Sequence, residues 1–188
     1  MAEPPPSPIA PPDPPLADGA IVLRLLCDAD APAIAAACAD PEIVRWIAVP
    51  VPYSIDDARV FVAATAAAWA TGGQLVFGIE ERATGELVGT IGLRRAEPFR
   101  ASVGYWIAPW ARRRGLATRA VRLVAGWAFR EPALVRLELH TLVGNDASGA
   151  VALAAGFTRE GVLRRYLSFR DRRVDAVVYS LLREELPG

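Results

Sequence analysis

Apolar and polar residues follow two different periods along this chain, and these periods predict its strands and helices. After Gly115, apolar positions such as Leu116, Ala120 and Val124 recur every three or four residues, which predicts an amphipathic helix to about Arg130. Short apolar runs bounded by glycine, proline or charged residues are typical of strands. Such runs stand at 21–26, 75–80, 87–94, 103–108, 134–141, 162–169 and 174–181.

Capping residues, aspartate or serine before a segment and glycine after it, predict the remaining helices. They are expected at 31–39, 42–46, 55–70 and 146–155, and Gly72-Gly73 is expected to end the third. The order of elements is then β-α-α-β-β-β-α-β-α-β-β. This order is that of an α+β fold with a mixed sheet.

The first 18 residues differ from the rest of the chain. They contain eight of its sixteen prolines and almost no apolar pattern with which to pack. We interpret residues 1–18 as a disordered tail and residues 19–188 as a single domain, a size sufficient to bury a core of its own.

Composition excludes several classes of protein. An apolar content of 53% with 22% charged residues is typical of a globular chain. The net charge of +0 argues against a general nucleic-acid binder. The longest uncharged apolar run, residues 60–70, is too short to span a membrane. The two cysteines, Cys27 and Cys38, are expected to be buried thiols in a reducing compartment. We expect a cytoplasmic protein, a monomer or a homodimer. Arginine supplies all of the basic residues, a usage associated with GC-rich bacterial genomes.

A basic turn joins the strand at 103–108 to the helix that follows Gly115. Pro109 ends the strand because proline cannot continue a hydrogen-bonded ladder. The first N–H groups of a helix lack internal partners and lie at the positive end of its dipole, so they suit a pyrophosphate. Arg112, Arg113 and Arg114 add positive charge there. From the residues alone, an ordinary solvated turn is an open alternative.

Several short motifs together carry a resemblance to a known family. Arg112-x-x-Gly115-x-Ala117 matches the signature R/Q-x-x-G-x-G/A. Gly89-Thr-Ile-Gly-Leu93 precedes it, and Asn145-x-x-Ser148 and Ala155-Gly-Phe157 follow it, in the family order. Over roughly residues 20 to 183 the chain resembles the GNAT family of N-acetyltransferases, in particular its RimJ/RimL-like branch.

The resemblance implies a fold and a cosubstrate. The implied sheet is mixed and mostly antiparallel, and it splays between its fourth strand (103–108) and its fifth (134–141), so that the pantetheine arm of acetyl-CoA pairs with the fourth strand. No metal is implied, and the only histidine, His140, has no committed role. The expected cofactor-binding residues are Tyr105, Trp106 and Ile107 at the thioester, Arg112, Arg113, Arg114, Gly115, Leu116, Ala117 and Thr118 at the pyrophosphate, and Asn145 at the arm.

The same resemblance suggests two catalytic residues. Ser148 would protonate the departing thiolate, with helix capping as the alternative for both Asn145 and Ser148. Glu138 would remove the proton of the amine, with an exposed strand residue paired with Arg136 or Arg164 as its alternative. Ala152 stands where other branches place a catalytic tyrosine, so a tyrosine acid is not expected unless Tyr166 supplies one from another strand.

The predicted function is an acetyl-CoA-dependent N-acetyltransferase that works by direct attack in a ternary complex. Its acceptor would be a primary amine, either a protein amino terminus or a small molecule. We expect residues 40–53 and 166–173 to contact it, since loops around a rigid scaffold usually determine specificity. The alternative is a non-catalytic acyl-CoA-binding or regulatory module on the same fold.

Overall fold

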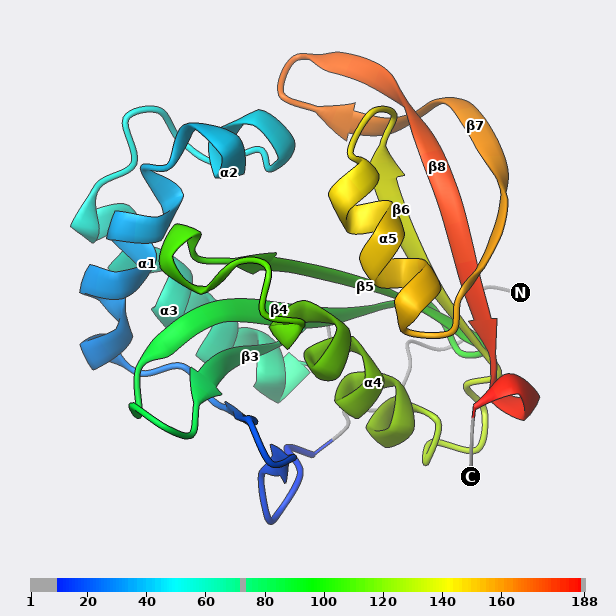
Figure 1. Cartoon of the computed structure of the whole chain (residues 1–188), viewed down its shortest axis with the longest axis horizontal. Helices are drawn as coiled ribbons and strands as arrows, with labels where there is room; N and C mark the ends of the chain where they lie inside the picture. Colours follow the sequence, from blue (N-terminus) through cyan, green and yellow to red (C-terminus); the bar gives the residue numbers. More distant parts are fainter. Residues whose placement is uncertain (1–9, 72–73, 187–188) are drawn as a thin grey trace.

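A mixed sheet forms the framework of the protein (Figure 1). The computed structural model describes residues 10–71 and 74–186. Within them the β5–β6 pair alone is parallel, and every other pair is antiparallel. This confirms the α+β prediction. In spatial order the strands are β1 (Leu16–Ala17), β2 (Ile21–Arg24), β3 (Gln74–Glu81), β4 (Leu87–Glu97), β5 (Arg100–Ile107), β6 (Arg136–Leu142), β8 (Arg172–Leu182) and β7 (Thr158–Phe169).

Helices cover both faces of the sheet. Figure 1 shows α1 and α3 on one side and α4 and α5 on the other. The described helices agree with the predicted ones to within about two residues at each end, a normal margin for helix ends. The predicted end of the helix at 55–70, at Gly72-Gly73, lies outside the described residues. The helices are α1 (Ala31–Cys38), α2 (Pro41–Trp46), α3 (Ile55–Thr71), α4 (Leu116–Ala128) and α5 (Asp146–Ala154), with short 3₁₀ turns at Asp28–Asp30, Pro109–Ala111 and Arg183–Glu185. No helix in the described ranges is long and apolar enough to cross a membrane.

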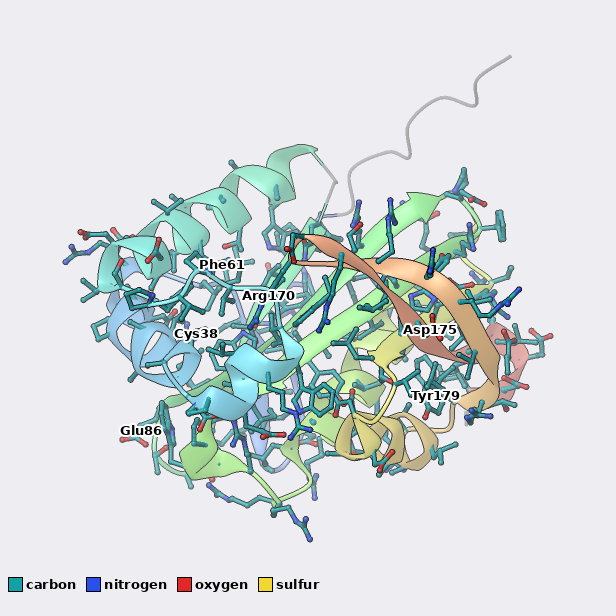
Figure 2. The ribbon with its side chains drawn as sticks, turned by 90° about the horizontal axis from the view of Figure 1, so that it is seen from above. Cys38, Phe61, Glu86, Arg170, Asp175 and Tyr179 are labelled. Carbon is teal, nitrogen blue, oxygen red and sulfur yellow. The ribbon has the colours of Figure 1, made fainter. Side chains whose placement is uncertain are left out.

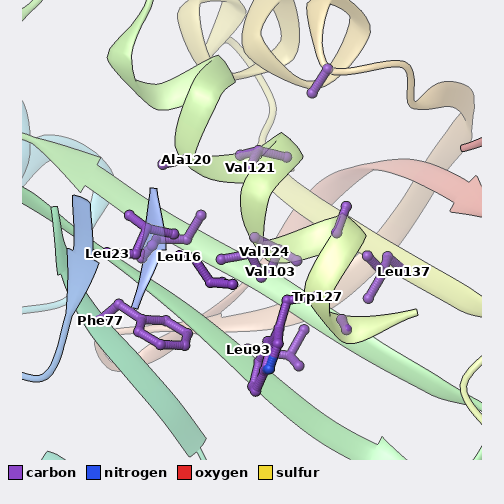
Figure 3. Packing of buried hydrophobic residues seen from close by; sticks show 14 of the residues in the cluster. Leu16, Leu23, Phe77, Leu93, Val103, Ala120, Val121, Val124, Trp127 and Leu137 are labelled. Atoms are coloured by element: carbon purple, nitrogen blue, oxygen red, sulfur yellow. The ribbon is translucent and has the colours of Figure 1, made fainter. Parts of the chain in front are cut away.

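The larger core lies between the sheet and α4. Its aromatic centre joins three elements: Phe77 of β3 meets Trp69 of α3 edge to face at 5.1 Å and Trp127 of α4 at 5.4 Å. Figure 3 shows Phe77 and Trp127 among the aliphatic side chains around them. A second cluster, which includes Ile34 and Val62, packs α1 and α3 on the opposite face. These cores cover the sheet on both sides. Cys38 belongs to the second cluster, whereas Cys27 is exposed, so the expectation of a buried thiol is wrong for Cys27.

The parallel pair β5–β6 separates partway along its length. The two strands pair only from Arg100 opposite Arg136 to Val103 opposite Leu139. Beyond these residues β5 continues to Ile107 and β6 to Leu142 without pairing to each other. The backbone of 104–107 on the side facing β6 is therefore free of strand hydrogen bonds, which confirms the predicted splay.

The interpretation of residues 1–18 as a disordered tail is wrong at its carboxyl end. Leu16 and Ala17 form β1, which pairs with β2, and the Leu16 side chain is only 8% exposed. Asp18 accepts hydrogen bonds from the backbone N–H groups of Ala20 and Ile21 and forms an ion pair with Arg119 at 2.9 Å. A strand of two residues among prolines leaves no periodic pattern, so the sequence did not reveal it. Residues 1–9 lie outside the described residues.

We predict that Leu16→Ala lowers the free energy of unfolding by about 2 kcal/mol, because it removes a buried side chain from the main core. Chemical denaturation measures this value. The matched control is Leu25→Ala, since Leu25 is 46% exposed and its loss should cost less than about 0.5 kcal/mol. Equal small effects of both substitutions would mean that β1 does not pack on the domain in solution.

Candidate active site

A cavity of about 920 Å³ opens where β5 and β6 separate. Figure 2 looks onto this region, with Cys38 and Phe61 on the α1 and α3 side and Arg170 on the turn between β7 and β8. The structure brings all of the expected cofactor-binding residues to this one cavity, together with Ser148. The lining includes Tyr105, Trp106, Ile107, Arg112, Arg113, Arg114, Gly115, Leu116, Ala117, Thr118 and Asn145.

The turn before α4 leaves the amino end of that helix open toward the cavity. Gly115 is the residue before the helix and adopts a φ of 73°, a left-handed conformation that glycine takes without strain. It has no side chain with which to cap α4, and no side-chain hydrogen bond caps the helix. Arg113 also has a positive φ, of 62°. The turn thus directs unpartnered backbone N–H groups at one point, as an anion site requires.

The three arginines of this turn differ in how free their charges are. Arg112 binds Asp40, the residue before α2, at 2.5 Å, and Arg114 is paired with Glu81. Arg113 forms no ion pair with any described residue. Three arginine charges were expected at the pyrophosphate. Among residues 10–71 and 74–186, only the charge of Arg113 has no protein counter-ion.

Asp40 links the arginine turn to α2. Its Oδ1 accepts hydrogen bonds from the backbone N–H groups of Glu42 at 3.1 Å and Ile43 at 3.0 Å, which caps α2, and also from Arg112. Desolvation raises the pKa of Asp40, but the hydrogen bond from Arg112 and the two backbone bonds outweigh it and leave that pKa below its ordinary value. The carboxylate is thus held ionised between two elements.

Side chains on the free part of β5 alternate between the two faces. Tyr105 packs against the core on the α4 side, whereas Trp106 packs with the α1–α3 cluster. Gly104 lies on the same face as Trp106, and a Cβ atom built on it would meet no atom within 4 Å. The cavity therefore reaches both faces of the sheet at this strand.

Ser148 is held by a tyrosine that sequence reasoning assigned only to the thioester pocket. The Tyr105 hydroxyl lies 2.9 Å from Ser148 Oγ, and burial raises the pKa of Tyr105 to about 12, so the phenol keeps its proton at neutral pH. Asn145 Oδ1 accepts from the backbone N–H of Ser148 at 3.1 Å, which makes Asn145 the cap of α5. Asn145 therefore caps the helix, as the capping alternative predicted. The Ser148 hydroxyl does not cap it. No sequence pattern links residues 105 and 148; only the fold does.

Glu138 does not reach the cavity. It lies in the paired part of β6, opposite Ser102, and is largely buried among arginines. Its carboxylate is 2.8 Å from Arg136 Nε and 3.4 Å from Arg100 Nη1. Glu138 is therefore an ion-paired strand residue, paired with Arg136 as the alternative expected and also with Arg100, but it is buried and not exposed. The structure does not place Glu138 in the cavity that contains Ser148. The strand reaches the cavity only farther on, at residues 139–142, and among these His140 is the one titratable residue. The sequence assigned His140 no role.

The end of the cavity away from the arginine turn is mainly apolar. Both segments expected at the acceptor, 40–53 and 166–173, contribute to its wall. Arg170 Nη2 donates to the backbone carbonyl of Val44 at 2.7 Å and so joins the β7–β8 turn to α2 across the mouth. The apolar wall includes Ile34, Ile43, Trp46, Ile47, Tyr53, Phe61, Leu167 and Phe169.

Several known proteins are similar to this chain in sequence and in fold. Residues 20–158 match the family model described as an acetyltransferase (GNAT) domain. The uncharacterized N-acetyltransferase YoaA of Bacillus subtilis is 33% identical over 165 residues, which is 87% of this chain and 93% of YoaA. The ribosomal-protein-serine acetyltransferase of Escherichia coli is 30% identical over 97 residues, 50% of this chain and 54% of that protein.

Solved structures agree with this match. The structure of RimJ from Mycobacterium smegmatis, in complex with CoA-disulfide, superposes with a TM-score of 0.79 at 28% identity and covers 89% of this chain and 84% of RimJ. Sequence, fold and site thus lead to one conclusion: the chain belongs to the GNAT family of acetyltransferases, in its RimJ-like branch.

Proposed function

We propose that this acetyltransferase moves the acetyl group of acetyl-CoA to the amino terminus of a protein, in a ternary complex of enzyme, donor and acceptor. One observation carries the proposal. The unpaired edge of β5 connects the open amino end of α4 to the Tyr105–Ser148 pair within one cavity. A long ligand with an anion at one end and a thioester at the other fits this arrangement.

The donor would be held by backbone as much as by side chains. The N–H groups of Leu116, Ala117 and Thr118 in the first turn of α4, with the charge of Arg113, suit the pyrophosphate. The free N–H and C=O groups of 104–107 suit the amides of the pantetheine arm, in the manner of an added strand. The bound thioester supplies an acyl carbon that an amine attacks directly.

The chain's own hydroxyls would complete the transfer. The Ser148 hydroxyl lies at the cavity wall and donates a proton to the departing thiolate. The Tyr105 phenol, 2.9 Å away and still protonated, orients that hydroxyl and replaces its proton. A buried relay of this kind requires both groups to be positioned before the reaction begins, and the cores on either side of the sheet hold them.

The acceptor proposal rests on the relatives and on the cavity. The Escherichia coli relative is named for a ribosomal protein, and the neighbouring structure is RimJ. The apolar end of the cavity opens between α2 and the β7–β8 turn, both at the surface, where a chain terminus would enter.

The acceptor experiment follows CoA thiol release from acetyl-CoA with three sets of amines. We expect turnover with peptides that have a free amino terminus, and none with the same peptides blocked at that terminus but carrying a free lysine. Turnover with small amines alone would replace the protein acceptor by a small molecule. Tight acetyl-CoA binding without turnover on any amine would favour the non-catalytic module.

We predict that Gly115→Glu abolishes the thermal stabilisation by acetyl-CoA, because it places a carboxylate at the open end of α4. Saturating ligand at 100 times its Kd should stabilise the natural protein by about 2.7 kcal/mol. Gly85→Glu is a matched control, since Gly85 has a φ of 72° and Gly115 one of 73°, and neither has an atom within 4 Å of an added Cβ. Loss of the shift in both variants would mean that backbone strain, and not the anion site, is responsible.

We predict that Ser148→Ala lowers kcat by about 100-fold, the low end for a general acid, with little change in the Kd of acetyl-CoA. Tyr105→Phe should act in the same direction. Stability should not fall by the amount of a lost helix cap, because Asn145 and the Ser148 backbone remain. Ser102→Ala, on β5 but outside the cavity lining, is the control and should leave kcat intact. An unchanged kcat in Ser148→Ala would remove the proton-donor role.

A further inference from the structure

Direct transfer to an amine involves two proton movements, and the Ser148–Tyr105 pair accounts for one of them. An acceptor amine at neutral pH is largely an ammonium ion, because an α-amino group has an ordinary pKa of about 8. It must lose a proton before its nitrogen can attack. The expected base, Glu138, lies outside the cavity lining, so another group must take this proton.

The fold separates the two proton movements onto opposite faces of the sheet. Tyr105 lies on the α4 face, and so does Leu139 of β6, which belongs to the same core. His140 follows Leu139, so its side chain points to the other face. That face carries Trp106 and Gly104 of β5 and the apolar end of the cavity. His140 thus lies on the side from which the acceptor would enter.

His140 has the surroundings of an oriented imidazole. Its Nε2 is buried, lies 3.5 Å from Glu138 Oε2, and makes no hydrogen bond with any described residue. The Tyr166 ring of β7 packs on the imidazole with centroids 5.2 Å apart. Because Nε2 faces Glu138 and the imidazole lines the cavity, Nδ1 is the nitrogen left for the cavity side. Catalytic hydrogen bonds are often long before substrate binds, so a separation of 3.5 Å is compatible with such a bond.

The charged and titratable groups around His140 come from three strands. Glu138 and Arg136 are on β6, Arg100 is on β5, and the Tyr166 phenol is on β7, while the opposite residue of β8, Val178, is uncharged. Burial lowers the pKa of His140 most strongly, Glu138 raises it, and Arg100 and Arg136 lower it further. The net direction is below 6.5, so the imidazole is neutral at pH 7 and can accept a proton.

We propose that His140 Nδ1 takes the proton from the acceptor ammonium, while Nε2–H points to Glu138 Oε2, which positions the ring. This inference rests on the proposed acetyl transfer. In the step, the ammonium N–H bond breaks, an Nδ1–H bond forms, and the amine keeps its electron pair for attack on the acyl carbon. After the attack the nitrogen gives up a second proton, which balances the proton that the Ser148–Tyr105 pair passes to the thiolate. The proton on Nδ1 leaves to solvent after transfer. Glu138 is then a positioning residue, and its ion pairs with Arg100 and Arg136 keep it in place.

The test is the pH dependence of kcat/KM for a peptide with a free amino terminus. In the natural protein the rate should fall only as pH drops through the lowered pKa of His140, below 6.5. In His140→Gln, the acid limb should move to about pH 8, where the α-amine itself loses its proton. The loss at pH 7 should be about tenfold, since about one-tenth of the amine is neutral there, and it should nearly vanish at pH 9.

Further variants and a spectroscopic measurement keep the test specific. Glu138→Gln should move the acid limb to lower pH, because it removes the carboxylate that raises the pKa of His140. Tyr166→Phe, which keeps the stacked ring, should leave the limb in place. Because His140 is the only histidine of the chain, its imidazole ¹⁵N signals are unambiguous. They should show the Nε2–H tautomer and a pKa below 6.5, both in the protein without acceptor.

Three results would overturn the proposal. The first is that His140→Gln stays active and its acid limb does not move. The second is that the acid limb moves in Tyr166→Phe instead, and the third is that the ¹⁵N signals show the Nδ1–H tautomer. Thermal stabilisation by acetyl-CoA in His140→Gln checks that the variant is folded with an intact donor site. If the natural protein is active and one of these results is found, only the role of His140 is rejected. If the natural protein acetylates no amine, the proposed acetyl transfer is rejected together with this role.

Discussion

The end of the parallel pairing between β5 and β6 is the constraint on which the rest of this structure depends. After Val103 and Leu139 the strands no longer share hydrogen bonds, and the backbone of 104–107 must find other partners or remain solvated. A compact domain tolerates such an opening in its sheet only if both faces are held elsewhere. The Trp69–Phe77–Trp127 centre on one side and the α1–α3 cluster on the other provide this support.

The same opening decides which residues act in the cavity. On the paired half of β6, Glu138 lies against β5 and forms ion pairs with Arg100 of β5 and with Arg136 of β6 itself. Residues past the opening, such as His140, line the cavity. A shift of two positions along one strand thus separates an ion-paired residue from one that can meet a substrate, although both point to the same face.

Much of the fold was predictable from the sequence because its signals are local. The periodicity of α4, the caps of α2 and α5, and the motif around Gly115 each depend on neighbouring residues. The features that were missed depend on distant ones. The bond between Tyr105 and Ser148 joins residues 43 positions apart, and Arg100, the partner of Glu138 that the sequence did not indicate, lies 38 positions away on β5. β1 is too short to show a period, and Leu16 is recognisable as a core residue only once β2 lies beside it.

Asp40 gives the two ends of the cavity a common electrostatic element. One carboxylate oxygen receives both the capping N–H groups of α2 and the Arg112 guanidinium. An anion that attracts Arg112 competes directly with Asp40, and it thereby changes the charge that stabilises the start of α2. Since α2 forms part of the apolar wall, a donor anion at Arg112 would act on the acceptor end through this single side chain, and such a linkage of the two affinities would be reciprocal.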